Sequence, residues 1–257
     1  MTASPAIRLR DAAVRFGAGE AAVTAFSGLD LEVAEGELLT IIGPSGCGKS
    51  TLLRLVSDLA PPSAGSVEVM GGAPAEARRR RDIGFVFQDA TLLPWRTVLQ
   101  NVRLPLEVGG GAAAAHASRS PETLLEMVGL AGRLDALPHE LSGGMRQRVA
   151  IARALVTGPR LLLMDEPFGA LDEIVRDRLN DELLRIWQET GTTILFVTHS
   201  IAEAAFLGQR VLVLAANPGR LRDLVDLRTI KPGNRIDRDD PRLFAATSSL
   251  RRTLETC

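Results

Sequence analysis

Residues 43–50 form a glycine-rich segment with the sequence Gly-Pro-Ser-Gly-Cys-Gly-Lys-Ser. It comes directly after the apolar run 38–42 and directly before an apolar-periodic segment, which indicates the order strand, loop, helix. Its glycines allow the backbone to fold closely around a phosphate chain, with N–H groups and a helix N-terminus directed at the anion. An ordinary glycine-rich turn rarely has both outer glycines, the lysine and the hydroxyl. We therefore predict a loop that binds a nucleoside triphosphate.

Individual residues of this loop have predicted roles. Lys49 is expected to neutralise charge on the β- and γ-phosphates, and Ser50 to be a ligand for Mg²⁺. The helix dipole and Lys49 are expected to lower the pKa of the Cys47 thiol. Kinases and GTPases carry this loop too, so it predicts the class of ligand and not the reaction. The other predicted nucleotide-binding residues here are Gly43, Pro44, Ser45, Gly46, Gly48 and Thr51.

Short apolar runs alternate with helix-like segments along the chain. Strands separated by helices indicate an α/β fold with a mostly parallel sheet that is covered on both faces. Residues before about 35 are expected to form a small antiparallel β layer, and residues 87–159 a helical insertion with a flexible Ala/Gly connection at 109–115. The polar tail after residue 214 has weak periodicity. The predicted strands are 37–42, 83–87, 161–164, 193–198 and 211–214, and the clearest helix is 173–190, ended by Gly191.

Composition excludes several classes of protein. The chain has 257 residues, of which 46% are apolar and 24% charged, so it can bury a large core. Its net charge of -1 gives no reason to expect binding to nucleic acid or anionic lipid. No apolar run approaches the ~20 residues needed to cross a bilayer and the N-terminus has no secretion signal, so a cytoplasmic protein is expected. Cys47 and Cys257 are predicted to be free thiols.

Residues 161–166, Leu-Leu-Leu-Met-Asp-Glu, are predicted to form a buried strand that ends in two carboxylates. Such a strand sets an acid beside the phosphate loop, at the C-terminal edge of the sheet. Asp165 is expected to hold Mg²⁺ through water, and Glu166 to polarise the water that attacks the γ-phosphate. Taken alone, a strand that ends in Asp-Glu fits equally well with capping of the next helix.

The segment 141–148, Leu-Ser-Gly-Gly-Met-Arg-Gln-Arg, narrows the class of nucleotide-binding protein to which the chain can belong. Ser142 is a good N-cap, and Gly143 and Gly144, which have no side chains, are expected to leave the first N–H groups of a helix accessible. The N-terminus of this helix is therefore predicted to be a second anion site. At this point the sequence resembles the ABC (ATP-binding cassette) ATPase family, with Met145 where Gln is commoner. The resemblance implies the ABC ATPase fold, a RecA-like P-loop core with a helical subdomain, and a head-to-tail homodimer that encloses two ATP molecules.

The resemblance extends to four further positions. It implies that Gln88 contacts Mg²⁺ and the attacking water, which makes Ser50, Gln88 and Asp165 the expected metal-binding set. It also implies that Asp172 crosses the dimer interface and that His199 donates a hydrogen bond to the γ-phosphate. Phe16 matches the aromatic that stacks on adenine, with Phe in place of the commoner Tyr, although a Phe in a small sheet is more often a core residue.

The resemblance covers nearly all of the first 220 residues. It implies an ATPase domain at 1–220 with the helical subdomain at about 89–158, followed by a C-terminal extension at 221–257. Within the family, segments 86–96, 141–148, 165–172 and 198–207 are most similar to the ATPases of bacterial nitrate, sulfonate and taurine importers. The implied protein is an ATP-hydrolysing importer subunit at the cytoplasmic face of the plasma membrane. Its implied partners are integral membrane permease subunits and, through them, a periplasmic or extracellular solute-binding protein.

The apolar run 90–95, Ala-Thr-Leu-Leu-Pro-Trp, is unusual for a loop. Its leucines are expected to pack in part inside the helical lobe, whereas Trp95 is the better candidate for exposure because Pro94 breaks regular structure before it. The resemblance places here the groove that receives a short cytoplasmic helix of the membrane subunit. Trp95 is therefore predicted to be a partner contact.

Two other classes share part of the pattern. ABC ATPases that act on DNA or ribosomes usually carry long coiled-coil insertions, zinc cysteines or a second cassette, and none is visible in the sequence. A P-loop kinase would need an acceptor-substrate site and would have no use for residues 141–144. The importer interpretation is favoured, with no nucleic-acid partner, and the solute stays open because other subunits bind it.

Overall fold

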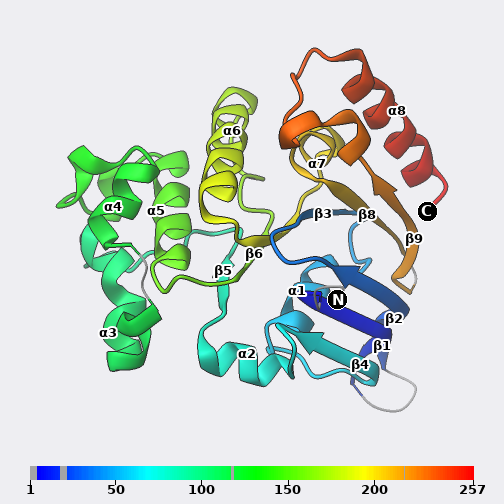
Figure 1. Cartoon of the computed structure of the whole chain (residues 1–257), viewed down its shortest axis with the longest axis horizontal. Coiled ribbons are helices and arrows are strands. Elements are labelled where there is room, and N and C mark those ends of the chain that lie inside the picture. The colour runs from blue at the N-terminus through cyan, green and yellow to red at the C-terminus, as the bar shows by residue number, and fades with distance from the viewer. Residues whose placement is uncertain (1–4, 18–21, 117–118, 217) are drawn as a thin grey trace. The chain divides into compact units, whose positions relative to one another are not determined.

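The computed structural model describes residues 5–17, 22–116, 119–216 and 218–257 (Figure 1). The chain divides into two compact units, one made of Met1–Arg80 with Thr193–Cys257 and the other of Arg81–Thr192. No helix in the described part of the chain is long and apolar enough to cross a membrane.

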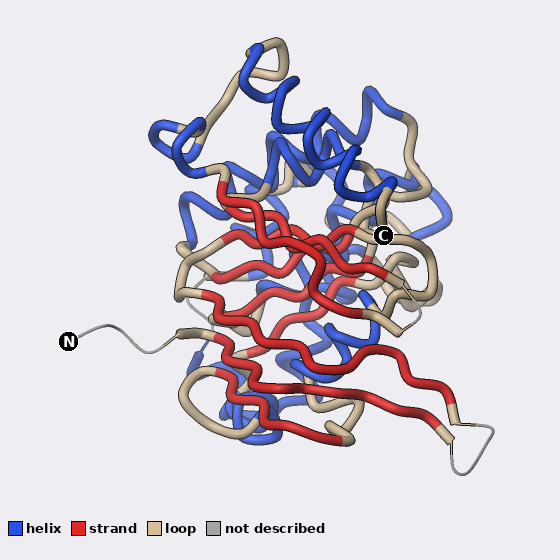
Figure 2. The backbone as a smooth tube through the Cα atoms, turned by 90° about the vertical axis from the view of Figure 1, so that its right-hand side faces the viewer, coloured by secondary structure: helices blue, strands red, loops and turns tan. Residues whose placement is uncertain are grey.

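The first unit contains a small antiparallel sheet, as predicted. Its strands are β1 (Ile7–Phe16), β2 (Val23–Val33) and β4 (Ala64–Val69), in the order β2-β1-β4 (Figure 2). In the central strand Ile7 and Leu9 are buried, and so are Ala12 and Val14, which is the alternation of a half-buried strand interrupted by a register shift between Leu9 and Ala12. The short helix α2 (Pro74–Arg80) follows β4.

The second sheet of the first unit runs in the order β7-β3-β8-β9. Strand β3 pairs in parallel with β7 and β8, and β9 pairs antiparallel with β8. All residues of β3 and β7 are buried, so these strands are covered on both faces. The strands are β3 (Leu38–Ile42), β7 (Thr193–Val197), β8 (Arg210–Ala215) and β9 (Arg220–Asp226), and the helices are α1 (Lys49–Val56), α7 (Ile201–Leu207) and α8 (Pro241–Glu255).

The tail after β8 is more ordered than its sequence suggests. It adds β9 to the sheet, makes two 3-10 turns, η4 (Arg228–Ile230) and η5 (Pro232–Asn234), and ends in α8, which packs on α7 and β8. Leu243 and Leu250, two turns apart on α8, are buried. A strand at 220–226 was not predicted, because its residues are mostly polar and exposed and only its pairing with β8 defines it.

Lys231 holds this tail against α7. Its side chain is 3% exposed, and Nζ donates to the carbonyls of Phe206 (2.8 Å) and Gly208 (2.5 Å) at the end of α7. Burial lowers the pKa of Lys231 from 10.5 to about 7. The Arg238 guanidinium lies 3.7 Å above the Phe206 ring. The tail is therefore joined to the core by polar contacts as well as by apolar packing.

The second unit contains the parallel pair β5 (Ile83–Val86) and β6 (Leu161–Asp165) and most of the helices. The predicted helix 173–190 is present with those bounds, and Gly191 ends it in the left-handed conformation. The flexible connection expected at 109–115 is wrong, because α3 continues through it. The four alanines at 112–115 favour a helix, whereas the three glycines before them do not. The helices are α3 (Val98–His116), α4 (Pro121–Met127), η2 (Ala131–Arg133), η3 (Pro138–Glu140), α5 (Gly143–Leu155) and α6 (Glu173–Thr190).

Candidate functional site

The phosphate loop connects β3 to α1, in the order that its sequence predicts. Gly48 is the N-cap of α1 and has φ 91°, a conformation that favours glycine. A Cβ at Gly43 would lie 2.5 Å from the Leu214 carbonyl oxygen, so the loop passes too close to β8 for any side chain. These glycines are required by the path of the loop backbone itself.

Lys49 is buried at the first position of α1, with 5% of its surface exposed. Its Nζ donates to the carbonyl oxygens of Gly43 (2.8 Å) and Pro44 (3.0 Å), which holds the ammonium across the loop. No acidic side chain lies in the first turn of α1. The loop therefore offers an anion one cation and the positive end of a helix.

Cys47 behaves differently from its prediction. Its thiol is fully buried in the loop, and burial raises its pKa, although Lys49, whose Nζ is 3.9 Å from Sγ, acts in the opposite direction. The predicted lowering of the pKa is wrong because loss of hydration outweighs the nearby cation. Cys47 and Cys257 are both free, as predicted.

His199 lies exposed between β7 and α7, and its neighbours fix the backbone on both sides. The Thr198 N–H donates to the Ile41 carbonyl (3.2 Å), and the Thr198 hydroxyl accepts from the Ser200 N–H (3.0 Å) and donates to Glu203. Ser200 caps α7 by accepting from the Glu203 N–H (3.2 Å). Roles for Thr198, Ser200 and Glu203 were not predicted, although the Ser-x-x-Glu spacing of a capping box indicates Ser200 and Glu203.

Phe16 is the last residue of β1, and 46% of its surface is exposed. The alternative that it is a core residue therefore does not hold. An exposed aromatic ring at a strand end is available to stack on a planar ligand.

Asp165 and Glu166, in the second unit, follow the buried part of β6. Glu166 has φ 49°, although it is not a glycine, and its carbonyl accepts from the Gly169 N–H (3.1 Å). A non-glycine residue in this region costs on the order of 1–3 kcal/mol and occurs most often at functional sites. Asp172, at the end of the same turn, is exposed and caps α6 by accepting from the Val175 N–H (3.0 Å).

The predicted second anion site is the N-terminus of α5. Ser142 is its N-cap and accepts from the Met145 N–H (3.3 Å), as predicted. Gly144 has a further reason to be glycine, because a Cβ there would lie 2.9 Å from Val175 Cγ1 of α6. A Cβ at Gly143 would be 3.2 Å from Leu171 Cδ2. The glycines therefore let the helix N-terminus pack closely against the segment before α6 and the start of α6.

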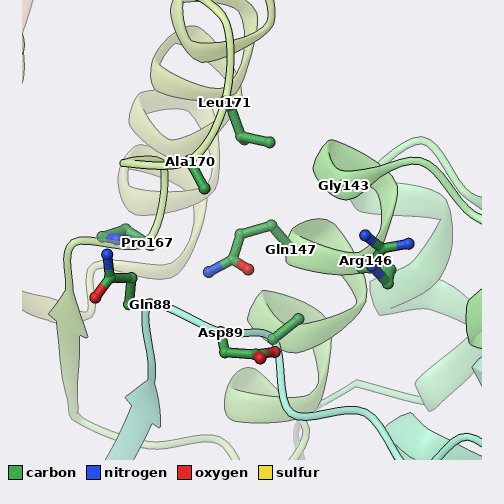
Figure 3. Close-up of a pocket in the computed structure, with 9 residues that line it drawn as sticks. Gln88, Asp89, Gly143, Arg146, Gln147, Pro167, Ala170 and Leu171 are labelled. Atoms are coloured by element: carbon green, nitrogen blue, oxygen red, sulfur yellow. The ribbon is translucent and has the colours of Figure 1, made fainter.

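A pocket of about 340 Å³ lies within the second unit (Figure 3). Its walls are the segment after β5 with Gln88, the first turns of α5, and the segment between β6 and α6. Figure 3 shows the Gln147 side chain of α5 between the other two walls. Three separately predicted motifs thus meet around one cavity. The lining residues are Gln88, Asp89, Ala90, Gly143, Arg146, Gln147, Pro167, Ala170 and Leu171.

Trp95 is 73% exposed, so the predicted exposure is confirmed. Leu92 and Leu93 are half-buried. The turn beneath is fixed by buried Asn101, whose amide donates to the carbonyls of Leu93 (3.2 Å) and Arg96 (2.9 Å). Trp95 is therefore presented on a rigid support.

The expected metal-binding set, Ser50, Gln88 and Asp165, offers only oxygen donors, which are the ligands that Mg²⁺ prefers. In the described part of the chain, no cluster of three His, Cys, Asp or Glu side chains could hold a metal ion by itself.

A phosphate loop between a parallel strand and a helix defines the class of P-loop nucleoside triphosphatases. A profile of the ABC transporter family matches residues 26–169.

An uncharacterized ABC transporter ATP-binding protein of Methanocaldococcus jannaschii is 48% identical over 213 residues, which is 83% of this chain and 79% of the relative. The aliphatic sulfonates import ATP-binding protein SsuB of Bacillus subtilis is 44% identical, over 84% of this chain and 82% of the relative. The taurine import ATP-binding protein TauB of Rhizobium johnstonii is also 44% identical, over 81% of this chain and 79% of the relative.

Among solved structures, a dimeric post-hydrolysis ATP-binding cassette bound to ADP and Pi superposes with a TM-score of 0.73 at 34% identity. The match covers 86% of this chain and 99% of that one. The chain therefore belongs to the ABC transporter family, and it is an ATP-binding ATPase with the predicted ABC fold. The predicted resemblance to sulfonate and taurine importer ATPases is also confirmed.

Proposed function

We propose that this chain is the ATP-hydrolysing subunit of an importer for a small sulfonate, taurine, nitrate or a related solute. The observation that carries the proposal is its 44% identity to sulfonate and taurine import ATP-binding proteins over more than four fifths of its length. The domain plan is an ATPase domain at 1–220 with a helical subdomain at about 89–158, followed by an extension at 221–257.

Two chains form the working unit, with one ATP held between each phosphate loop and the α5 N-terminus of the partner. The exposed cap residue Ser142 at the N-terminus of α5 supports this arrangement, because the positive end of a helix favours an anion such as the γ-phosphate. Asp172 is exposed at the N-terminus of α6 and reaches the partner from there. The dimeric cassette with ADP and Pi is a precedent in the family.

The nucleotide is held by the first unit. Lys49 moves from the loop carbonyls to the β- and γ-phosphates, the backbone N–H groups of residues 43–51 surround the phosphate chain, and Phe16 stacks on the adenine. His199 donates to the γ-phosphate from a backbone that Thr198 and Ser200 hold in place.

Hydrolysis adds water to the γ-phosphorus and breaks its bond to the bridging oxygen of ADP. Glu166 accepts the proton of the attacking water and so acts as general base, while Gln88 orients that water. Mg²⁺, held by Ser50, Gln88 and, through water, Asp165, would neutralise charge on the phosphates. A base of this kind typically contributes about 10²–10⁴ in rate.

The partners are two integral membrane permease subunits and, through them, a solute-binding protein on the other side of the membrane. The chain is peripheral, on the cytoplasmic face of the plasma membrane. Trp95 is the proposed contact with the permease, because it is a large exposed aromatic on a fixed turn.

The test is to reconstitute the chain with the permease encoded beside it and the neighbouring solute-binding protein, and to measure ATP hydrolysis with taurine, an alkanesulfonate and nitrate. One of the three should raise the rate in the complete system and leave the isolated subunit unaffected. Stable assembly with hydrolysis that responds to none of these solutes would refute the substrate assignment. Failure to assemble with any permease would refute the transport role.

A further inference from the structure

The loop that carries Gln88, residues 87–91, is attached to α5 by two side chains of that helix. The first is Gln147, which is only 4% exposed and lies on the turn that follows Ser142. Its amide Nε2 donates to the carbonyl oxygen of Phe87 (3.0 Å), the residue immediately before Gln88. A buried amide that reaches 60 residues back along the chain fixes the start of the loop.

The second side chain is Arg153, further along the same helix. Its guanidinium donates through Nη2 to the Ala90 carbonyl (2.7 Å) and through Nη1 to the Thr91 carbonyl (2.9 Å). Nη2 also lies 3.1 Å from the Thr91 hydroxyl oxygen. Burial lowers the pKa of Arg153, because removing the guanidinium charge from water costs free energy. The hydrogen bonds to the Ala90 and Thr91 oxygens offset that cost. The end of the loop is therefore fixed as firmly as its start.

These contacts bracket Gln88. The held carbonyls belong to Phe87 on one side and to Ala90 and Thr91 on the other, while the Gln88 and Asp89 side chains stay exposed. Gln88 and Gln147 both line the pocket in Figure 3. We infer that Gln147 and Arg153 are positioning residues, which hold the backbone on both sides of Gln88 against α5, the helix that carries Ser142 at its N-cap. The inference rests on the proposed role of Gln88 in hydrolysis.

A simpler explanation is that both side chains only satisfy buried carbonyls and thereby stabilise the fold. The two explanations differ in what happens when Gln88 is absent. A positioning residue has nothing left to position in that background, whereas a purely structural residue has the same effect with or without Gln88.

The experiment compares Gln147→Leu and Arg153→Lys with the matched control Gln188→Leu, which makes the same substitution at an exposed site on α6. Each of the two loop variants should lower kcat by about five-fold, the effect expected from one lost hydrogen bond. The Kd for ATP should stay within about two-fold, because the phosphate loop is untouched. Arg153→Lys keeps the charge and the stem but loses the planar fork, so it provides a conservative test if Gln147→Leu folds poorly.

The same substitutions are then made in a Gln88→Ala background, where each should change kcat by less than about two-fold if it acts through Gln88. If the fold-decrease in kcat is the same in the Gln88→Ala background as in the wild type, the inference is overturned and only a structural role remains for Gln147 and Arg153. Equal kcat for Gln147→Leu, Arg153→Lys and the Gln188→Leu control would overturn it as well.

Amide hydrogen exchange separates this inference from the proposed function. Exchange at residues 87–91 should accelerate in both loop variants and not in the control. If Gln88→Ala alone leaves kcat unchanged, the proposed role of Gln88 fails, and faster exchange would still support the attachment of the loop to α5. Unchanged exchange in both variants would refute that attachment, whatever Gln88 does.

Discussion

The buried amine of Lys231 makes the stability of the fold depend on pH. Its pKa is lowered from 10.5 to about 7 because the ammonium is removed from water. One pKa unit corresponds to about 1.4 kcal/mol, so burying the charged form costs on the order of 5 kcal/mol. Replacement by methionine removes the charge and keeps a chain of similar length, at the loss of two hydrogen bonds to carbonyls worth about 1 kcal/mol each.

The pH dependence follows from which state binds the proton. Below about pH 7 the amine is protonated in both the folded and the unfolded chain, so it contributes no slope. Between about 7 and 10.5 the unfolded chain keeps the proton and the folded chain does not, so the free energy of unfolding rises with pH. The slope is about 1.4 kcal/mol per pH unit, which is about 2–3 kcal/mol between pH 7 and about pH 9.

The assay is urea unfolding of the wild type and Lys231→Met at several pH values across this window. Between about pH 7 and 10.5, the difference in unfolding free energy between the wild type and Lys231→Met should change by about 1.4 kcal/mol per pH unit. NMR of protein labelled only at lysine gives the pKa directly, because Lys49 is the only other lysine in the chain. If the free energy of unfolding of the two proteins depends on pH in the same way, and NMR gives Lys231 a pKa near 10, the claim that Lys231 is held in a desolvated site is refuted.

Four further predictions concern the nucleotide site and its partners. Lys49→Ala should weaken ATP binding, whereas Glu166→Gln should keep binding and lower turnover by about 10²–10⁴; normal turnover in the latter would remove Glu166 as the base. Purified Glu166→Gln should sediment as a monomer without nucleotide and as a dimer with ATP, and an unchanged mass would count against shared sites. Maleimide should label Cys47 far more slowly than Cys257, because the Cys47 thiol is buried and Cys257 is exposed; equal rates would contradict that burial. Trp95→Ala should leave basal ATP hydrolysis intact and weaken co-purification with the permease, and normal assembly and transport would exclude a coupling role.

The parts of the site that the sequence predicts well are those that local chemistry defines. The phosphate loop is contiguous, and its glycines, lysine and hydroxyl carry the same meaning wherever the chain places them. The same is true of the cap Ser142 and of the strand that ends at Asp165. Buried runs such as β3 are recognisable because every residue is apolar or small enough to be covered on both faces.

The parts that the sequence does not predict depend on partners far away along the chain. Nothing in the sequence near Gln147 or Arg153 indicates that their acceptors lie some 60 residues earlier. Strand β9 shows no alternation of apolar residues and exists because β8 offers it an edge. The pKa of Cys47 was predicted from the nearby cation and the helix dipole, but how deeply the thiol is buried is a property of the fold.

The left-handed backbone at Glu166 sets two kinds of selection against each other. Asparagine or glycine adopts this conformation more readily, so directed evolution for heat resistance alone should enrich them at this position. Selection for ATP hydrolysis should restore the carboxylate under the proposed mechanism, in which Glu166 accepts a proton from water, because neither replacement can do so. A library of variants at position 166, selected once for heat resistance and once for activity, should therefore give different residues in the two selections. The most heat-resistant proteins should be among the least active.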